Sequence, residues 1–333
     1  MMSWWDNKKE QESGAWLAKL DEDSIAVESE RKVWAGNAKT CAIRKLQGKQ
    51  MLFLGTEPAD VLTSDDMGGT WRGTDTFAAI PERKKWTFPA KPHKPHTMSI
   101  DFAPTAEDEA TDCPVVMAGV EVGGALIMNA DGLWENRLGD KTSSGAFQLC
   151  HDVHQLRPDP FRPSRWYAIC GATQSKSSQL PDCEGGLYRS EDSGATWQRI
   201  FDGGPGEGQS ASVGRGLGYT VGLALNADQQ GELIVCAGDK APGIGAHVYH
   251  SLDGGETMQD ITEAVAHSEG INIGGHTPVP YFTGGAALLA FDNGQVAINR
   301  GNARCNQWLL LAQLPGAVLS LCVGSRMPSS VIH

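Results

Sequence analysis

A short motif that returns three times along the chain constrains the fold more than any other feature. The shared pattern is S-x-D-x-G-x-T-[W/M], and the copies are SDDMGGTW (residues 64–71), SEDSGATW (190–197) and SLDGGETM (251–258). The second and third motif aspartates are 61 residues apart, and the first two are 126 apart, about twice that spacing. Self-similarity at a fixed period is typical of repeat architectures.

The period predicts a further copy near residue 129. The chain there reads LIMNADGLWENRL, in which Asp131, Gly132 and Trp134 keep a shortened motif. A fifth, more degenerate copy is expected in VAINRGNARCNQWLLLAQLP, with Trp308 in the tryptophan position.

Each copy lies in a similar context of short apolar and alternating segments. A run such as ELIVCAGD precedes a short strand such as AHVYHS that leads into the motif, another short strand follows it, and one more precedes the apolar run. Four strands per unit of about 60 residues, together with abundant glycine, predict an all-β propeller of four-stranded blades. The expected blades are 33–75, 95–137, 150–200, 217–260 and 276–313 of a single domain covering 1–333. A sixth blade from 316–333 and 1–30 would close the ring through the two termini; six blades are expected, with seven as the alternative.

Each position of the motif has a structural role. The aspartate accepts hydrogen bonds from its own turn, the glycine permits backbone angles that a side chain resists, and the tryptophan packs on a neighbouring sheet, where Met258 fills similar space. We interpret the motif as the hairpin between the third and fourth strands of a blade, not as a catalytic element. The residues given this role are Ser64, Asp66, Gly68, Trp71, Ser190, Asp192, Gly194, Trp197, Ser251, Asp253 and Gly255.

With these motifs the chain resembles the Asp-box or BNR-repeat β-propellers, which include sialidases, sortilin-type receptors, some glucanases and photosystem assembly factors. The stretches GTEPADVLTSDDMGGTW and GGLYRSEDSGATWQRI look closest to uncharacterised bacterial sialidase-like proteins. The resemblance covers roughly residues 50 to 313. It implies the propeller fold and suggests glycan hydrolysis or a binding function.

Charge and hydropathy exclude several classes of protein. A formal net charge of −12 disfavours a nucleic-acid or anionic-membrane partner, which needs a basic face. The N-terminal MMSWWDNKKEQESGAW has no apolar core of secretory length, so we expect a soluble cytoplasmic protein without membrane insertion, unless a signal segment has been removed. The eight cysteines form no C-x-x-C pair, and we expect reduced core thiols, with Cys170 and Cys236 at equivalent buried strand positions.

Functional residues are expected at the end of the blades opposite the motif hairpins. The inner strands of a propeller line a central channel, so the segments that lead into them converge at its mouth. The loops between second and third strands supply Glu57, Glu121, Asp239 and Lys240. The segments that lead into inner strands supply His96, His151, Asp152, His154, Arg215, Tyr219 and His276.

Three chemical interpretations compete for these residues. His96, His151 and His276, with His154 or Glu121, could bind one divalent metal ion (Zn, Fe or Mn) that activates water. Alternatively, Glu57 and Glu121 could be the acid and base of glycosidic cleavage. A true sialidase is not expected, because the F-R-I-P signature is absent and its mimic at 161–163 lies in an expected bottom turn.

The expected function is therefore an enzyme, a hydrolase or lyase, that acts on a small polar or glycan-like substrate at the channel mouth. The expected catalytic residues are Glu57, Glu121, His154, Arg215 and Tyr219, with Arg215, Asp239 and Lys240 binding substrate. The alternative is a non-catalytic binding or assembly propeller, either a scaffold or a glycan-binding module. An enzyme should bring the polar groups together at the mouth, whereas a scaffold should show an apolar patch on a blade edge.

Overall fold

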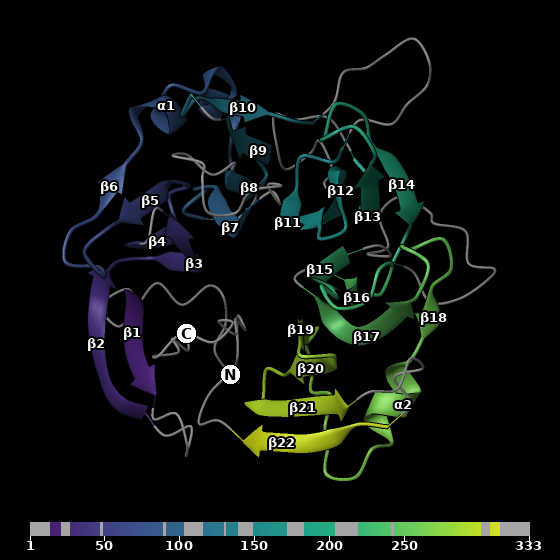
Figure 1. The fold of residues 1–333 in the computed structure, drawn as a ribbon. Coiled ribbons are helices and arrows are strands. Elements are labelled where there is room, and N and C mark those ends of the chain that lie inside the picture. The colour runs from purple at the N-terminus through teal and green to yellow at the C-terminus, as the bar shows by residue number, and fades with distance from the viewer. Residues whose placement is uncertain are drawn as a thin grey trace.

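Five four-stranded antiparallel sheets form the blades of a β-propeller (Figure 1). The structure is a computed structural model, and it describes residues 14–20, 27–46, 49–88, 91–102, 116–129, 131–138, 149–171, 183–203, 219–240, 243–300 and 307–313. Each blade is a meander in which strands consecutive in the sequence are hydrogen-bonded neighbours. The propeller fold predicted from the repeat is thus confirmed.

The strands of each blade follow one another from the channel outward. The first blade holds β3 (Ala38–Leu46), β4 (Lys49–Thr56), β5 (Val61–Ser64) and β6 (Arg72–Gly73), and the second holds β7 (His96–Phe102), β8 (Val116–Glu121), β9 (Gly124–Met128) and β10 (Trp134–Asn136). The third holds β11 (Val153–Asp159), β12 (Arg162–Cys170), β13 (Gly186–Ser190) and β14 (Gln198–Phe201). The fourth holds β15 (Tyr219–Leu225), β16 (Leu233–Lys240), β17 (Ile244–Ser251) and β18 (Gln259–Asp260), and the fifth holds β19 (Val279–Thr283), β20 (Ala286–Ala290), β21 (Gln295–Arg300) and β22 (Leu309–Gln313).

The prediction of six or seven blades is wrong, because the described residues form five. The N-terminal segment expected in a sixth blade instead forms β1 (Gly14–Leu20), which pairs with β2 (Val27–Ala35) in a separate two-stranded sheet. This sheet lies beside the first blade (Figure 1), where the indole N–H of Trp71 donates to the carbonyl oxygen of Val33 in β2 at 2.8 Å. The C-terminal segment 316–333, expected to complete the sixth blade, lies outside the described residues.

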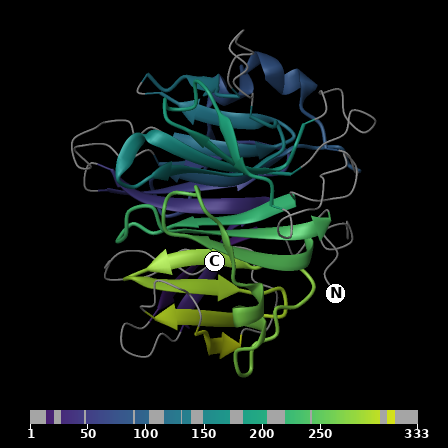
Figure 2. The same ribbon diagram turned by 90° about the vertical axis from the view of Figure 1, so that its right-hand side faces the viewer.

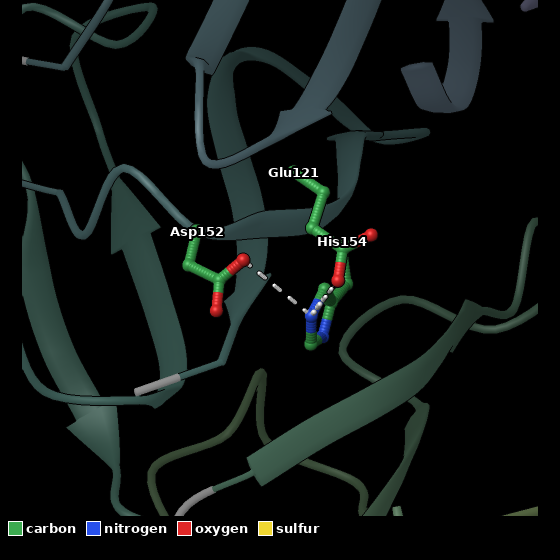
Figure 3. Close-up of side chains that lie close together, drawn as sticks. All are labelled: Glu121, Asp152 and His154. Carbon is green, nitrogen blue, oxygen red and sulfur yellow. Dashed lines mark ion pairs between the residues drawn. The ribbon is translucent and has the colours of Figure 1, made fainter. Parts of the chain in front are cut away.

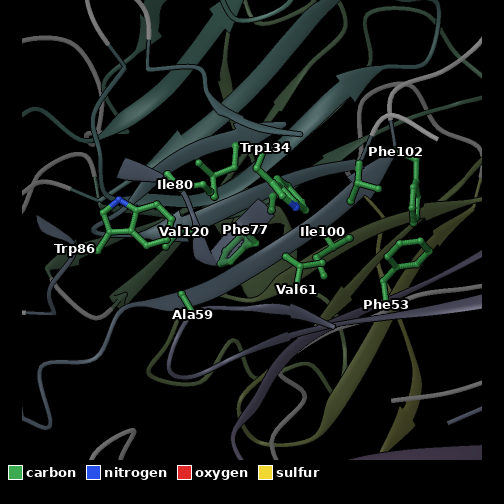
Figure 4. Close-up of a cluster of buried hydrophobic side chains, with 13 residues drawn as sticks. Phe53, Ala59, Val61, Phe77, Ile80, Trp86, Ile100, Phe102, Val120 and Trp134 are labelled. Carbon is green, nitrogen blue, oxygen red and sulfur yellow. The ribbon is translucent and has the colours of Figure 1, made fainter. Parts of the chain in front are cut away.

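The hydrophobic core is divided into layers between neighbouring blades, which face one another around the ring (Figure 2). Between the first two blades, Phe53 packs against Phe102 with ring centroids 4.9 Å apart, in a cluster that also contains Ile100 and Val120 (Figure 4). Because side chains alternate across a strand, adjacent residues serve different layers: Leu289 faces the fourth blade and Leu288 the opposite side of the fifth.

Three short helical segments follow outer strands of the blades. They are α1 (Asp75–Ala78), the 3₁₀ segment η2 (Pro81–Lys85) and α2 (Thr262–Ala266). Phe77 of α1 is fully buried and makes edge contacts with the rings of Trp86 and Trp134. In the part of the chain that the structure describes, no helix has the length and apolarity needed to cross a bilayer.

The repeated motif forms the turn between the third and fourth strands, as predicted. In the second copy, Asp192 accepts hydrogen bonds from the N–H and hydroxyl of Thr196 at 2.8 and 2.6 Å and from the Ser190 hydroxyl at 2.8 Å. Gly194 has φ of +81°, and a Cβ there would come within 2.8 Å of the Trp166 ring. The other two copies repeat the aspartate contacts, so the motif serves the fold.

In the second and third blades the motif tryptophan links the blade to the one before it. Trp197 is buried, and its indole N–H donates to the carbonyl oxygen of Arg137 at 2.7 Å, at the end of the preceding blade. In the degenerate copy, Trp134 likewise bonds the hydroxyl of Thr74. There the acceptor of the turn is Asn129, whose side-chain oxygen bonds the N–H groups of Asp131 and Leu133, so Asp131 does not take the motif aspartate's place.

The motif aspartates should make the protein acid-sensitive. Hydrogen bonds from the Thr70 N–H and from the Ser64 and Thr70 hydroxyls lower the pKa of Asp66 to about 2. For Asp192 and Asp253 burial acts in the opposite direction, but the hydrogen bonds outweigh it and the pKa of each is also lowered. Because the folded-state pKa lies below the unfolded one, this stabilisation is present above about pH 4 and is lost as pH falls towards about 2.

We therefore expect the unfolding temperature to fall between about pH 5 and about pH 2. A triple variant with Asp66, Asp192 and Asp253 replaced by Asn should be less stable at neutral pH but lose less over that range. Thermal unfolding followed by circular dichroism measures how the unfolding temperature of each protein changes with pH. An equal change for the wild type and the triple variant would contradict this account.

The cysteines differ in part from expectation. Cys170 and Cys236 are buried free thiols on the second strands of their blades, as predicted. Cys150 and Cys183, however, form a disulfide, so the expectation of reduced thiols throughout is wrong for this pair. Their sequence separation of 33 residues gave no indication of the pairing.

Candidate functional site

Six ionisable side chains from the first three blades meet at the end opposite the motif turns. They occur where inner strands begin or second strands end, namely Lys39 in β3, Glu57 after β4, His96 at the start of β7, Glu121 at the end of β8, Asp152 just before β11 and His154 within it. In an antiparallel meander these two positions share one edge of the sheet. His96 and Glu121, for example, are direct partners in the β7–β8 register.

These side chains form a continuous series of alternating charge. The Lys39 ammonium lies 2.8 Å from a Glu57 oxygen, and that same oxygen lies 3.2 Å from Nε2 of His96. The other ring nitrogen of His96, Nδ1, bonds Glu121 at 3.0 Å. The series thus crosses from the first blade to the second through one imidazole.

The series continues into the third blade through His154. Its Nε2 lies 3.7 Å from Oε1 of Glu121 and 3.8 Å from Oδ1 of Asp152, and Figure 3 shows both carboxylates directed at this nitrogen. The other nitrogen, Nδ1, donates to the carbonyl oxygen of Thr220 at 2.5 Å. This bond fixes the orientation of the ring and leaves Nε2 towards the carboxylates.

Asp152 is the unsatisfied end of the series. Its side chain is only 6% exposed, yet Oδ1 has no hydrogen-bond partner. Buried carboxylate oxygens are normally bonded, and an exception requires an explanation such as a missing ligand. Asp152 Oδ1 is therefore the atom of the cluster at which another group is most needed.

The carboxylates of Glu57 and Glu121 are held charged. Burial would raise the pKa of Glu57, but hydrogen bonds from His96 and Lys39 outweigh it and lower that pKa to about 2. Burial acts likewise on Glu121, whose pKa is lowered to about 2 by His154 and His96. In return, although burial opposes it, Glu121 and Glu57 raise the pKa of His96.

In the inner part of the cluster the pKa values of an acid and of a base are both raised. Burial raises the pKa of Asp152 to about 6. Burial would lower the pKa of His154, but Glu121 and Asp152 outweigh it and raise that pKa to about 9. Carboxyl groups whose environments separate their pKa values in this way are characteristic of functional sites.

Gly171 and Tyr219 close the cluster on the side of the fourth blade. The ring of Tyr219, the first residue of β15, lies 4.9 Å from that of His154. A Cβ placed on Gly171 would come within 2.4 Å of Oδ2 of Asp152 and 2.9 Å of both the His154 and Tyr219 rings. Only glycine fits this position without moving the site.

Gly171→Ala should therefore displace the cluster and destabilise the fold by about 1–3 kcal/mol, the usual cost of overpacking. Gly275→Ala is the matched control, because a Cβ there meets nothing closer than 3.9 Å. Chemical denaturation of both variants gives the comparison; equal stability of the two would show that the space around Gly171 is not tight.

The structure brings some of the predicted site residues together and leaves others apart. Glu57, His96, Glu121, His154 and Tyr219 belong to the cluster. His151 is buried beside it, with Nδ1 3.7 Å from the sulfur of Cys183, and burial lowers its pKa to about 4.

The remaining predicted residues do not join the cluster. His276 lies half-buried before β19, in a bridge with Ile244, and exposed Asp239 pairs with His247 at 2.9 Å. Lys240 ends β16, while its side chain, like all of Arg215, lies outside the described residues. Among described residues, the one group of three potential metal ligands within 4.8 Å is Glu121, Asp152 and His154, so the predicted set of His96, His151 and His276 is not assembled.

Two members of the cluster were not predicted to act there. Lys39 lies at the start of an inner strand, like the histidines, so the same positional argument would have found it. Asp152 was recognised at such a position but given no role, because only the packed side chains reveal its unpartnered oxygen.

The fold resembles those of solved propellers. The GH74 xyloglucanase from Xanthomonas campestris matches with a TM-score of 0.53 at 20% identity, over 82% of this chain and 38% of that one. An ancestral GH74 enzyme matches with a TM-score of 0.52 at 16% identity, over 89% and 38%, and YCF48 bound to a D1 peptide with 0.45 at 14% identity, over 84% and 69%. This chain thus spans well under half the length of the two GH74 proteins.

At these identities the likeness establishes the β-propeller fold. No protein family's sequence profile matches the chain, and no curated protein matches it. The narrower resemblance to Asp-box and sialidase-like proteins therefore depends on the motifs themselves.

Proposed function

We propose that the chain is an enzyme that cleaves a glycan-like substrate by proton transfer at the buried cluster formed by Lys39, Glu57, His96, Glu121, Asp152 and His154. The observation that carries this proposal is the unpartnered Oδ1 of Asp152 at the end of an otherwise satisfied series of charges. A scaffold has no use for such an oxygen, because leaving it unbonded costs stability.

The other members of the cluster hold Asp152 and the reacting group in place. Glu121 and Glu57 are each fixed by imidazole contacts, and the Thr220 carbonyl fixes His154. In hydrolysis, Asp152 would accept a proton from the attacking water as its oxygen bonds the sugar carbon. The glycosidic C–O bond would break, and the leaving oxygen would take its proton from the protonated His154 beside Asp152. Such positioned proton transfer typically contributes about 10²- to 10⁴-fold to the rate.

The substrate class is supported by the fold comparison. The two similar structures with TM-scores above 0.5 are GH74 enzymes, and one of them is a xyloglucanase. We therefore take xyloglucan as the first substrate to test. The inner strands of a propeller line its central channel, and the cluster lies where inner strands begin and second strands end.

The test is release of new sugar ends from a panel of polysaccharides. Wild-type protein should generate reducing ends, or unsaturated ends if cleavage is by elimination, and Asp152→Asn should lower the rate by about 10²–10⁴-fold. Asp101→Asn is the matched control, because Asp101 pairs with Arg157 away from the cluster, at a partly exposed position. Wild-type protein that releases no ends from any polysaccharide, or Asp152→Asn with full activity, would contradict the proposal.

A second candidate function is a non-catalytic binding propeller. It is favoured by β22, the outermost strand of the fifth blade, where consecutive Leu309, Leu310 and Leu311 are 64%, 41% and 51% exposed. Exposed apolar side chains on a sheet edge are suited to contact with another protein. Replacing all three with Ser should abolish such binding without affecting the release of sugar ends.

A further inference from the structure

The spacing of three donor atoms in the cluster is the basis of a more specific inference. Nε2 of His154 lies 3.7 Å from Oε1 of Glu121 and 3.8 Å from Oδ1 of Asp152. Both distances exceed the limit of about 3.2 Å for a good N–H···O hydrogen bond. One buried imidazole and two buried carboxylates therefore converge on one point as loose ion pairs, without a short hydrogen bond between them.

This spacing is close to that of ligands around a metal ion. Zinc bonds of about 2.0–2.2 Å to nitrogen and oxygen place the ligands of a tetrahedral site about 3.3–3.6 Å apart. The three donor atoms all lie within 4.8 Å of one another, so movements of up to about 1 Å would bring them to that geometry. We propose that Glu121, Asp152 and His154 bind one divalent first-row metal ion such as Zn²⁺.

The unpartnered oxygen of Asp152 is independent support for a bound ion. Oδ1 is the Asp152 atom that faces His154, and it is buried without a hydrogen-bond donor. Figure 3 shows it directed into the space shared with Glu121 and His154. A cation there would bind this oxygen, which receives no hydrogen bond from the described residues.

The groups behind the three ligands have the arrangement expected of an outer shell. His154 donates Nδ1–H to the Thr220 carbonyl, which leaves Nε2 as the ligand atom, and the second oxygen of Glu121 accepts from His96. Such partners orient metal ligands, and their loss typically weakens binding by about 10- to 100-fold. The proposed ligands and their side-chain partners thus come from the second and third blades, and the Thr220 carbonyl comes from the fourth.

The three donor groups also limit which ions can bind and indicate what the ion would do. One imidazole and two carboxylates suit Zn²⁺, Fe²⁺ or Mn²⁺, whereas Ca²⁺ requires about six to eight oxygen ligands. Three protein ligands leave a position for water, as in catalytic zinc sites. This inference deepens the proposed function: the water attacking the substrate would be a metal ligand, and Asp152 would hold the ion rather than take the proton directly.

The test is zinc binding by the full chain, stripped with a chelator and then titrated with Zn²⁺ in a calorimeter. Wild-type protein should bind one ion per chain and retain it through gel filtration, as elemental analysis measures. Asp152→Asn and His154→Gln should each weaken binding at least about 100-fold, as loss of a direct ligand should exceed the loss of an outer-shell partner.

Two control variants make the result specific. His276→Ala removes a histidine of the sequence-based set that lies outside the cluster, and His250→Gln removes a buried histidine that already bonds Glu232 at 2.9 Å. Both should bind Zn²⁺ like the wild type. Zn²⁺ should also raise the unfolding temperature of the wild type, a readout that remains if one ligand variant fails to fold.

The inference is overturned if the wild type binds no Zn²⁺ or is not stabilised by it, if the folded ligand variants bind as tightly as the wild type, or if His276→Ala alone abolishes binding. None of these measurements uses a substrate. Metal binding without release of sugar ends would therefore contradict the proposed function alone. Release of sugar ends by metal-free protein would contradict only the role of the ion in the reaction, because the titration by itself decides whether the ion binds.

Discussion

Trp197→Ala is expected to lower the free energy of unfolding by about 3–5 kcal/mol, the usual cost of removing a large buried aromatic side chain. Trp197 is fully enclosed between the second and third blades, and its indole N–H bonds the Arg137 carbonyl oxygen at 2.7 Å. The substitution removes both the packing and the hydrogen bond to the backbone of the preceding blade. Chemical denaturation of the two proteins measures the difference.

Trp197→Met is the informative control for this prediction. The third motif has Met258 in the same position, partly buried against the corresponding core layer. Methionine is flexible enough to fill part of the space, so Trp197→Met should be more stable than Trp197→Ala, though less stable than the wild type. A loss below about 1 kcal/mol for Trp197→Ala would be inconsistent with a structural role for the motif.

Glu121→Gln should also have a large effect, because Glu121 lies between two buried imidazoles. Its oxygens face His96 at 3.0 Å and His154 at 3.7 Å. Removing one partner of a buried ion pair typically costs about 3–5 kcal/mol, since the remaining charge is left uncompensated. The same change should abolish the release of sugar ends.

The matched control is Glu135→Gln, which removes the same charge from a surface pair. Glu135 lies 2.7 Å from Arg137, but both side chains are at least one third exposed. Such pairs contribute about 0–1 kcal/mol, so this variant should unfold almost like the wild type. If the two substitutions had equal effects, the cluster would be no more than an ordinary surface network.

The sequence was sufficient to predict the architecture because the repeat carries its own turn chemistry. Asp66, Asp192 and Asp253 follow the third strands of the first, third and fourth blades, and the period located the degenerate copy around Trp134. The number of blades was not predicted correctly, because counting strands cannot show that β1 and β2 pair with each other.

The candidate site was predicted in part for a topological reason. Starts of inner strands and ends of second strands meet at one edge, and this rule selected Glu57, His96, Glu121 and His154, which lie together in the structure. The same rule does not say how far apart two such residues lie around the ring of blades. It therefore grouped His276 of the fifth blade with histidines of the second and third, from which it is separate.

The remaining features of the site depend on side-chain geometry that the sequence does not show. The ring nitrogens of His154 face different partners, and Oδ1 of Asp152 remains unbonded, only because of how neighbouring blades pack. Neither property has a signature in the spacing of residues along the chain.

The most direct test of this account compares Asp152→Asn with Asp192→Asn, measuring release of sugar ends and unfolding temperature for each. Asp152→Asn should lose activity while remaining folded. Asp192→Asn, which weakens only a motif turn, should lose about 1–2 kcal/mol of stability and keep its activity at a temperature where it is folded. The reverse pattern, an active Asp152→Asn and a folded but inactive Asp192→Asn, would place the chemistry at the motif turns and contradict the account.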